Sequence, residues 1–571
     1  MKTTSILSRA TTLALTALLF LSSLPNHAHA IAQEVETQAG SGDLDPTFGN
    51  GGKLTTIFAG GSPPYASAYA LAIQTDGKVV AVGAASIGPG NIAFAVARYN
   101  GDGNLDSGFG TGGKVTTDFS NTTDAAFSVA IQADGRLVLA GYVRNTLDID
   151  GADFALARYN TDGSLDTSFG TGGRVTTDIS GHVDIATSVA VMADGRVLVG
   201  GSGASQSSSL DPTAYSYNFE LARYNSSGSL DTSFGAGGKV ITDLFGHGEQ
   251  LGRILVQDDG KILAVGYSQT TSSVESRDFA LVRYQADGSL DSDFGAGGKV
   301  NTDFFGHDDA AGPVAIGRDG KIVVAGFCNT SADPDVYLRR SAVAQYKANG
   351  KLDKSFGSGG KVTTDSGQSD GVSALLLQPD DKILAAGSRR TSAGSSSEDF
   401  ALTRYDADGS LDVSFGAGGR VITDFFGIND AATAMALQAD GKIVLAGYAF
   451  INTSPNTSIA RFALARYAGD PAPDFTFGFD QSSVVGERGT TVKIHALITR
   501  AGGFTGNITI TAPEASGIKM KPADPVSTTD QTTTFKLKIK AGAPVGSQQL
   551  TFTASDNAGH VKTATVTVVI E

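Results

Sequence analysis

Tryptophan is absent from this sequence, and cysteine is nearly so. The 571 residues include no Trp and one Cys, Cys328. A single cysteine excludes an intramolecular disulfide framework. Familiar catalytic motifs are missing as well, because every Gly-Lys pair is followed by Val, Leu or Ile rather than Ser or Thr, and neither H-E-x-x-H nor G-x-S-x-G occurs. These absences exclude a P-loop, a zincin site and a nucleophile elbow, and a lone Cys328 is more often a bystander than a nucleophile.

A basic excess and long apolar runs are also lacking. The formal charge is −15, and it becomes 41 − 58 = −17 when Lys2 and Arg9 are removed with the first 30 residues. Nucleic acid and anionic lipid are therefore not expected as partners, because both require a basic surface. The longest apolar run, Leu13–Leu24, is too short to span a membrane.

The N-terminus has the features of an export signal. Lys2 and Arg9 precede the apolar run, which is followed by Ala28-His-Ala30. We expect residues 1–30 to be a secretory signal peptide with an A-x-A cleavage site, residues 31–42 to be a flexible segment, and the mature protein to be secreted or held at the cell surface.

A repeat occurs seven times between residues 43 and 467. Its clearest copy is Ser128–Asp178, in which an Asp134-Gly135 turn joins two short strands, an apolar strand ends at Tyr159, and a Gly-rich turn leads to a fourth strand. A period of about 60 residues built of short strands is typical of a propeller or a solenoid. Seven third strands end in Tyr, but no fourth strand follows Tyr467, whereas Lys53–Phe58 precedes the first repeat. We therefore predict an all-β, seven-bladed propeller closed by its N-terminal strand, because closure removes exposed strand edges.

These units resemble a known family. Ala439-Asp-Gly-Lys-Ile-Val-Leu-Ala-Gly-Tyr448, Phe-Ala-Leu-x-Arg-Tyr and Asp-Gly-Ser-Leu-Asp-x-Ser-Phe-Gly are similar to the delta-60 repeat of bacterial β-propellers, and their spacing is similar to that of NHL-type blades. The resemblance implies the fold and a secreted or surface setting, and it implies no activity.

A second domain is expected after the repeats. Residues 468–474 form a Pro-containing linker, and residues 475–571 contain alternating strand-like runs at 491–499, 507–511, 533–540, 549–554 and 562–570. Such short strands within about a hundred residues predict an Ig-like β-sandwich, and 503–510 resembles modules at the C-terminus of secreted bacterial proteins.

Acidic residues recur in two patterns. Asn160-x-Asp162-Gly163-x-x-Asp166 is superficially like a calcium loop, but it lacks the ligands of an EF-hand and its middle acid is lost in two copies. A turn in which Asp bonds its own backbone explains every copy, so we assign no cofactor and keep calcium as the alternative.

The second pattern follows the fourth strand. Two acids lie six residues apart, as in Asp178 and Asp184, and three copies place a histidine between them. Acids that cap turns, with His as a tolerated loop residue, are the favoured interpretation. If the three histidines lay near the propeller axis, their imidazoles and the adjacent acids could form a cation-binding arc. The sequence at the end of the fourth strand instead favours a position near the rim, where the histidines would be too far apart to share an ion. We therefore assign no metal ligand and retain a pH-dependent role of the histidines in ligand binding.

Variation is confined to one face. The loops after strands two and four should emerge together, and the loops after strand two differ in length and composition. The candidate ligand-binding residues on this face are His182, His247, His307, Asp184, Glu249, Asp309, Tyr215, Tyr217 and Tyr337. We favour a monomeric, non-enzymatic binding or adhesion scaffold for an extracellular protein or carbohydrate. The alternatives are a propeller hydrolase or lyase that uses the acids and histidines on polysaccharide, and a passive surface spacer.

Overall fold

The computed structural model describes residues 40–571 except 59, 62–63, 120–121, 145–150, 207–214, 272–276, 331–338, 366–367, 391–396, 455–456, 471–473, 502–505, 523–524 and 557–559. The predicted signal peptide and residues 31–39 lie outside the described part. Within that part every regular element is a β-strand, and no helix is long and apolar enough to cross a membrane.

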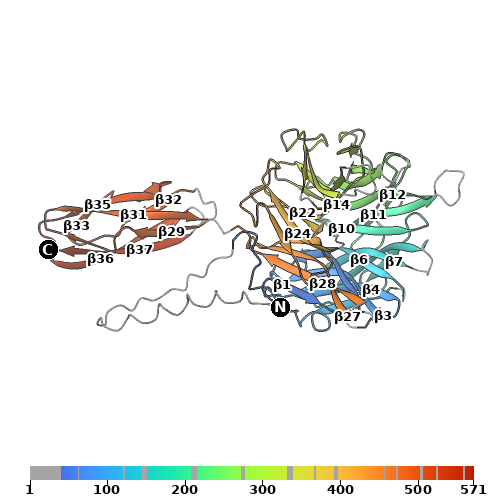
Figure 1. Ribbon diagram of the computed structural model, residues 1–571, viewed down its shortest axis with the longest axis horizontal. Coiled ribbons are helices and arrows are strands. Elements are labelled where there is room, and N and C mark those ends of the chain that lie inside the picture. The colour runs from blue at the N-terminus through green and yellow to red at the C-terminus, as the bar shows by residue number, and fades with distance from the viewer. Residues whose placement is uncertain are drawn as a thin grey trace, which may run out of the picture. The chain divides into compact units, whose positions relative to one another are not determined.

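Residues 53–467 form seven antiparallel sheets of four strands each (Figure 1). In order from the inner to the outer strand, the first six blades are β2 (Ala66–Ile73), β3 (Val79–Gly88), β4 (Asn91–Tyr99) and β5 (Lys114–Thr117); β6 (Asp124–Ile131), β7 (Leu137–Arg144), β8 (Ala152–Tyr159) and β9 (Arg174–Thr177); β10 (Asp184–Val191), β11 (Val197–Gln206), β12 (Tyr215–Tyr224) and β13 (Lys239–Thr242); β14 (Glu249–Val256), β15 (Ile262–Gln269), β16 (Arg277–Tyr284) and β17 (Lys299–Thr302); β18 (Asp309–Ile316), β19 (Ile322–Asn329), β20 (Arg339–Tyr346) and β21 (Lys361–Thr364); β22 (Asp370–Leu377), β23 (Ile383–Arg390), β24 (Glu398–Tyr405) and β25 (Arg420–Thr423).

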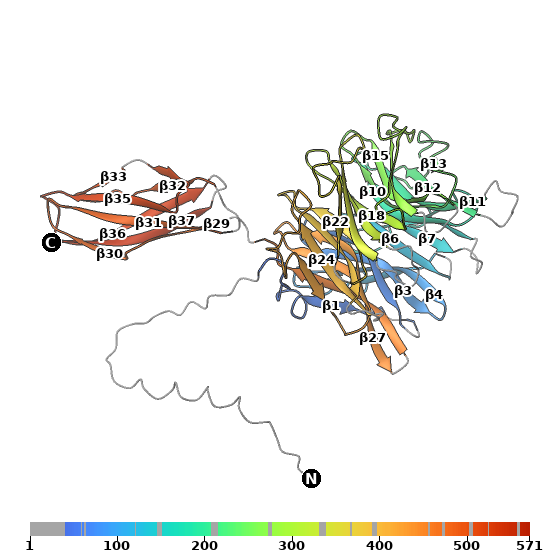
Figure 2. The same cartoon turned by 45° about the horizontal axis from the view of Figure 1, so that its top comes forward.

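The seventh blade closes the ring with strands from both ends of the repeat region. It consists of β26 (Asp430–Leu437), β27 (Ile443–Ser454), β28 (Thr457–Tyr467) and β1 (Lys53–Thr56), and Lys53 pairs with Ala465 in β28. The predicted closure by the N-terminal strand is therefore confirmed. Figure 2 shows the long β27–β28 hairpin projecting from the edge of the propeller.

Buried third strands hold neighbouring blades together. Phe154–Tyr159 is buried throughout, as predicted for a strand packed on both faces. Tyr159 Oη donates to Thr117 Oγ1 of the preceding blade at 2.7 Å, and all seven blades repeat this Tyr–Thr bond.

An arginine in the third strand makes a second link between blades. Arg158, which is 4 % exposed, pairs through Nε with Asp166 at 2.7 Å, and its Nη1 donates to Ser226 O in the next blade at 2.6 Å. Its guanidinium also lies over the Phe169 ring, 4.5 Å from the centroid. Five other blades repeat the ion pair, with Arg98, Arg223, Arg283, Arg404 and Arg466, whereas the fifth blade has Gln345 in this register.

Glycine is required at the hairpin turns. Gly135 has φ of 83°, a left-handed conformation in which a Cβ is disfavoured. In the sixth blade Asp381 adopts φ of 65° at the same point, and it is the one non-glycine residue of the described part with a positive φ.

Residues 474–570 form two further sheets. One has the order β29 (Asp474–Phe479), β31 (Thr491–Ala501), β35 (Thr532–Ile539) and β33 (Ile518–Lys521); the other has β30 (Ser483–Gly486), β37 (Val561–Ile570), β36 (Gly546–Asp556), β32 (Ile508–Thr511) and β34 (Val526–Thr528). Both contribute to one buried core, in which Phe535 and Phe552 lie 5.0 Å apart between ring centroids. The five strands predicted here are confirmed in position.

Candidate functional site

The variable loops emerge on a single face of the propeller. In the second blade Asp124 pairs with Val143, Val143 pairs with Asp153, and the next residue, Phe154, pairs with Thr177. The start of the inner and third strands and the end of the second and fourth strands therefore lie at one level, as the sequence predicted.

The acids that begin the inner strands are buried at the junctions between blades. Asp184 and Asp309 are 0 % exposed and Glu249 is 1 % exposed. Leu244 N donates to Glu249 Oε1 at 3.0 Å, and Phe304 N donates to Asp309 Oδ2 at 2.7 Å. Burial raises the pKa of Asp184, and it raises the pKa of Glu249 to about 7 and that of Asp309 to about 8. Their hydrogen bonds from backbone N–H groups hold the inter-blade loops, and Glu249 also lines a hollow together with Tyr217.

The partner acids cap the same loops. Asp178 Oδ1 accepts from Gly181 N at 2.6 Å, and Asp243 Oδ1 accepts from Gly246 N at 2.5 Å. His182, His247 and His307 follow these glycines and are half-buried. Within the described part, the three groups of side chains that come close enough to share a metal ion contain carboxylates and none of the three histidines.

Of the three tyrosines predicted to bind a ligand, the structure describes the side chain of one. Tyr217 is exposed and lines a hollow of about 250 Å³ with Gln250, Tyr267 and Gln269. Tyr337 and the side chain of Tyr215 lie outside the described residues.

Three hollows of this face meet at Tyr267. A hollow of about 540 Å³ is lined by Tyr267, Phe327 and Glu398, among others, and a second of about 290 Å³ is lined by Phe127, Tyr267 and Arg253. The hollow with Tyr217 is the third, and Tyr267 alone lines all three. We call this combined space the Tyr267 hollow.

The second of these spaces lies at the propeller axis. Its walls come from five inner strands, and each inner strand has a register shift at the point that faces it, for example between Ala126 and Ser128, where Phe127 is passed over. A bulge turns its extra side chain away from the ladder, so Phe127, Thr187 and Ser373 line the channel.

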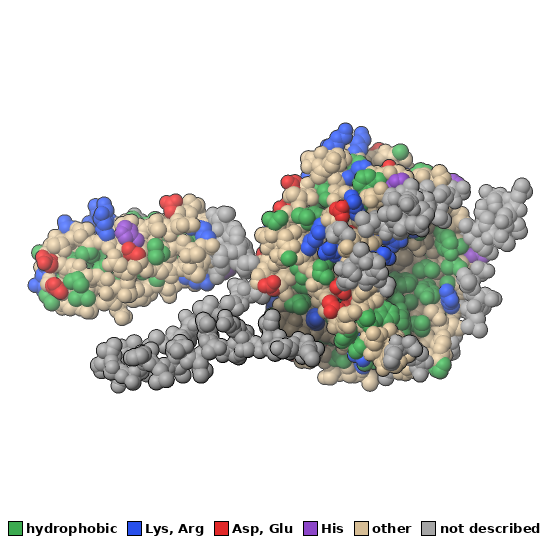
Figure 3. Space-filling model, viewed as in Figure 1, with side chains coloured by type: hydrophobic (Ala, Val, Ile, Leu, Met, Phe, Trp, Pro, Cys, Tyr) green, Lys and Arg blue, Asp and Glu red, His purple; other side chains and the backbone are tan. Residues whose placement is uncertain are grey.

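Aromatic rings and arginines lie together around the hollow. The Arg277 guanidinium is 5.0 Å from the centroid of Tyr267 and is paired with Asp308, and Arg339 is 4.2 Å from the centroid of Phe327. Tyr267 Oη donates to Gln250 Oε1 at 2.9 Å. These contacts hold the ring of Tyr267 in place before a ligand arrives. Figure 3 shows Lys and Arg side chains beside hydrophobic ones on the propeller.

Arg253 is the charged residue of the axial channel. Its Nη1 lies 3.5 Å from Ser128 Oγ across the ring, and burial lowers its pKa. Among the described residues no Asp or Glu forms an ion pair with it. The other inner strands have Ala, Ser or Val in this register, so Arg253 supplies a half-buried positive charge at the base of the hollow.

Sequence reasoning named Tyr217 but missed Tyr267, Arg253 and the other residues near the start of the third strands, although the repeats contained a signal for them. Tyr267 follows a Gly that recurs in the second strand of each blade, and the same position is occupied by Tyr142, Phe327 and Tyr448 in three other blades. The third strands are otherwise closely repeated, but they differ at the position two residues before the one that pairs with the end of the fourth strand. This position holds Ile92, Ala152, Tyr217, Arg277, Arg339, Glu398 and Ala460. A position that varies within a repeated strand indicates a surface selected for something other than packing.

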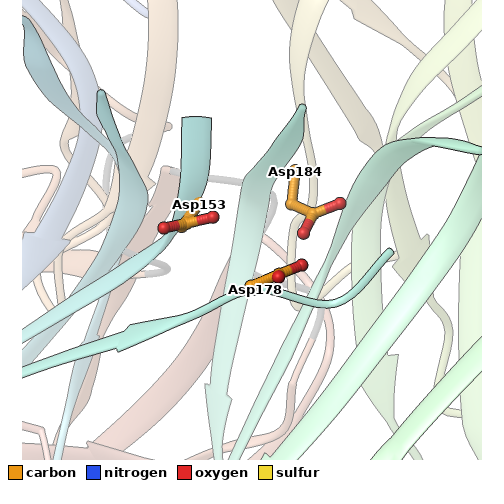
Figure 4. Close-up of side chains that lie close together, drawn as sticks. All are labelled: Asp153, Asp178 and Asp184. Atoms are coloured by element: carbon orange, nitrogen blue, oxygen red, sulfur yellow. The ribbon is translucent and has the colours of Figure 1, made fainter. Parts of the chain in front are cut away.

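Three junctions could hold a metal ion. Figure 4 shows Asp153 from β8, Asp178 after β9 and Asp184 at the start of β10 gathered at one of them. By contrast, the acids of the calcium-like turns are used locally, because Asp162 Oδ1 accepts from Ser164 N at 2.9 Å and Asp166 pairs with Arg158.

Together the sheets and their repeats define a seven-bladed β-propeller. The family model described as "Domain of unknown function (DUF5122) beta-propeller" matches residues 74–109, 132–169, 193–234, 257–294, 317–356, 378–415 and 438–464. The chain belongs to this family through its seven repeats, and the resemblance to delta-60 repeat propellers is confirmed.

Other similarities are distant. Among curated proteins none matches the chain significantly. Solved structures with some likeness include domains 4 and 5 of the S-layer protein SbsC (14 % identity, 29 % of this chain, 89 % of that chain, TM-score 0.14) and an alpha-L-arabinofuranosidase from Lactobacillus brevis (13 %, 54 %, 95 %, TM-score 0.29). Fibronectin(III)-like modules of Clostridium thermocellum CbhA are also similar (15 %, 34 %, 88 %, TM-score 0.14). These TM-scores are too low to carry an argument about this chain.

Proposed function

We propose that this protein is an exported, non-enzymatic scaffold that binds an acidic extracellular carbohydrate in the Tyr267 hollow. The observation that carries the proposal is the meeting of three hollows at Tyr267, with the half-buried Arg253 at the axis. Binding sites are concave and mostly preformed, with a few placed polar groups, and ends of the strands that lead into the variable loops line this one.

The chemistry favours a sugar that carries a carboxylate. The face of a tyrosine ring can pack against the apolar face of a pyranose. An arginine is matched to a carboxylate by its planar pair of donors, and Arg253 has no acidic partner within the described residues. Because the protein as a whole is acidic, a local positive charge would select the anionic ligand at this point.

The proposal also covers export of the protein and the role of its C-terminal part. The charged and apolar pattern of residues 1–30 supports secretion. Two sheets over one core support an Ig-like sandwich for residues 475–571, which we propose to be a spacer or attachment module joined through residues 468–474.

The test is binding of uronic-acid polysaccharides to the purified chain, measured on a glycan array and then by calorimetry, with neutral polysaccharides alongside. We expect Tyr267→Ala and Arg253→Gln each to weaken binding by about tenfold or more, as for a central contact. Tyr448→Ala is the matched control, since Tyr448 occupies the same strand register in the seventh blade and does not line the hollow.

Two results would contradict the proposal. Equal loss of binding in Tyr448→Ala and Tyr267→Ala would place the ligand elsewhere. Release of reducing or unsaturated sugar during incubation would instead indicate a hydrolase or a lyase, for which Asp370 and Glu398 in the large hollow are the acids to replace.

A further inference from the structure

In the described part of the chain, groups of three carboxylates gather at three of the seven junctions between blades. Each group contains one acid from the third strand, the residue after the fourth strand, and the first residue of the next inner strand. In each group the three acids offer oxygens that lie within 4.8 Å of one another. The groups are Asp153, Asp178 and Asp184; Asp278, Asp303 and Asp309; and Asp399, Asp424 and Asp430.

Two of these groups contain a buried oxygen without a hydrogen bond. Asp309 and Asp430 are 0 % exposed. Their Oδ2 atoms accept backbone N–H groups from Phe304 and Phe425, each at 2.7 Å, whereas their Oδ1 atoms accept no hydrogen bond from the described residues. A buried carboxylate oxygen without a partner is costly, so each indicates a missing positive group.

A further buried acid, Glu220, lies beside Asp184 of the first group. Glu220 is 0 % exposed and both of its oxygens lack a partner among the described residues. Gly203, the register partner of Asp184, provides its space, because a Cβ there would lie 2.1 Å from Glu220 Oε1. Every other blade has Ala in the register of Glu220.

Another junction of the same chain supplies its own cation. In the fifth blade Arg340 occupies the register of Asp153, and its Nη2 pairs with Asp365 Oδ2 at 2.7 Å. Asp365 follows the fourth strand, as Asp178 does. At the three acidic junctions an acid stands in place of this arginine. Lysines of the neighbouring blades, Lys239, Lys361 and Lys53, donate there to the backbone oxygens of Asp178, Asp303 and Asp424 at 2.6, 2.9 and 2.8 Å, whereas Arg340 pairs with a carboxylate.

We propose that each of the three acidic junctions binds a calcium ion that bridges adjacent blades. The ligands are all oxygen and include neither His nor Cys, a set suited to a hard cation, and calcium accepts the flexible geometry of carboxylates and backbone carbonyls. The middle acid of each group is exposed, which leaves a route for the ion from solvent.

The test uses the full chain after removal of metal with EDTA, with Ca²⁺ as the only added ligand. Calorimetry should give three sites per chain, and the melting temperature should rise by several degrees, because a ligand that binds only the folded state stabilises it. Replacing all three third-strand acids, Asp153→Asn, Asp278→Asn and Asp399→Asn, should weaken binding by about tenfold or more and abolish the rise.

The matched control makes the same charge change in the same blades on the opposite face. Asp162→Asn, Asp287→Asn and Asp408→Asn together alter the calcium-like turns and should retain three sites. If the first triple variant does not fold, Asp153→Asn alone should reduce the sites from three to two. Absence of Ca²⁺ binding in the native chain, or unchanged binding in the junction variants, would overturn the proposal, and loss in the control variant would move calcium to the turns.

Discussion

Arg158→Gln is the most informative test of how the blades are held together. The chain itself contains this replacement, because Gln345 occupies the same register in the fifth blade, where Lys321 lies 3.1 Å from the acid Asp353. At Arg158 the change removes an ion pair to Asp166, a hydrogen bond to Ser226 O across the blade boundary and the contact with Phe169.

The expected cost follows from burial. The side chains of Arg158 and Asp166 are 5 % and 8 % exposed, and removing one partner of a buried pair costs about 3–5 kcal/mol. Arg136 Nε remains 3.5 Å from Asp166 and offsets part of the uncompensated charge. We therefore expect a loss of about 3 kcal/mol in the free energy of unfolding, at the lower end of that range. Arg136→Gln is the matched control, with the same partner but a side chain that is 40 % exposed, and it should cost less than about 1 kcal/mol.

The assay is urea unfolding at pH 7 followed by far-UV circular dichroism and tyrosine fluorescence, since the chain has no tryptophan. Adding Asp166→Asn to Arg158→Gln should recover part of the loss, because the orphaned charge is then removed. Equal destabilisation by Arg158→Gln and Arg136→Gln would refute the reasoning, since burial would then not distinguish the two pairs.

Four further outcomes are expected. Deleting residues 31–58 removes β1 and leaves β28 as an open edge, so soluble monomer should be lost; a monomer with an unchanged melting temperature would contradict the closed ring. Burial opposes ionisation of Asp45, but hydrogen bonds from Thr47 and the cations Lys442 and Arg466 outweigh it and lower its pKa to about 2. Because the folded pKa is below the unfolded one, this carboxylate contributes about 2 kcal/mol above pH 4 that is lost as the pH falls from about 4 to 2, and the difference between wild type and Asp45→Asn in urea unfolding should shrink over that window. Asp381→Gly should stabilise the chain by about 1 kcal/mol, since φ of 65° suits glycine; a lower urea midpoint would show that the Asp side chain does more than occupy the turn. Limited proteolysis within residues 468–474 should release two folded fragments, and a propeller that unfolds without residues 475–571 would show that the two parts depend on each other.

The repeat pattern was sufficient to predict the propeller and its closure. Strand order in a meander follows from local turns, and the Asp-Gly hairpins and Gly-rich turns set each turn by backbone conformation alone. The missing fourth strand after Tyr467 and the extra strand before the first repeat left one way to complete seven blades. The burial of Arg158 was not apparent from the sequence, because an arginine between two apolar residues is equally compatible with a solvent-exposed position at the edge of a sheet.

The site depended on contacts between residues far apart in the chain. The sequence identified the variable face and the acidic loops, but it did not indicate that Asp184, Glu249 and Asp309 are buried between blades, where backbone N–H groups donate to them. The pairing of residues within a blade can be derived by counting along the repeated strands, whereas the distance between side chains of different blades cannot be derived from the sequence. Only the tertiary structure brings Arg253 to within 3.5 Å of Ser128, 125 residues away, or Glu220 to Gly203 beside Asp184. Local sequence determined which strands form, and the packing of seven blades around one axis decided which side chains are enclosed and which face the hollow.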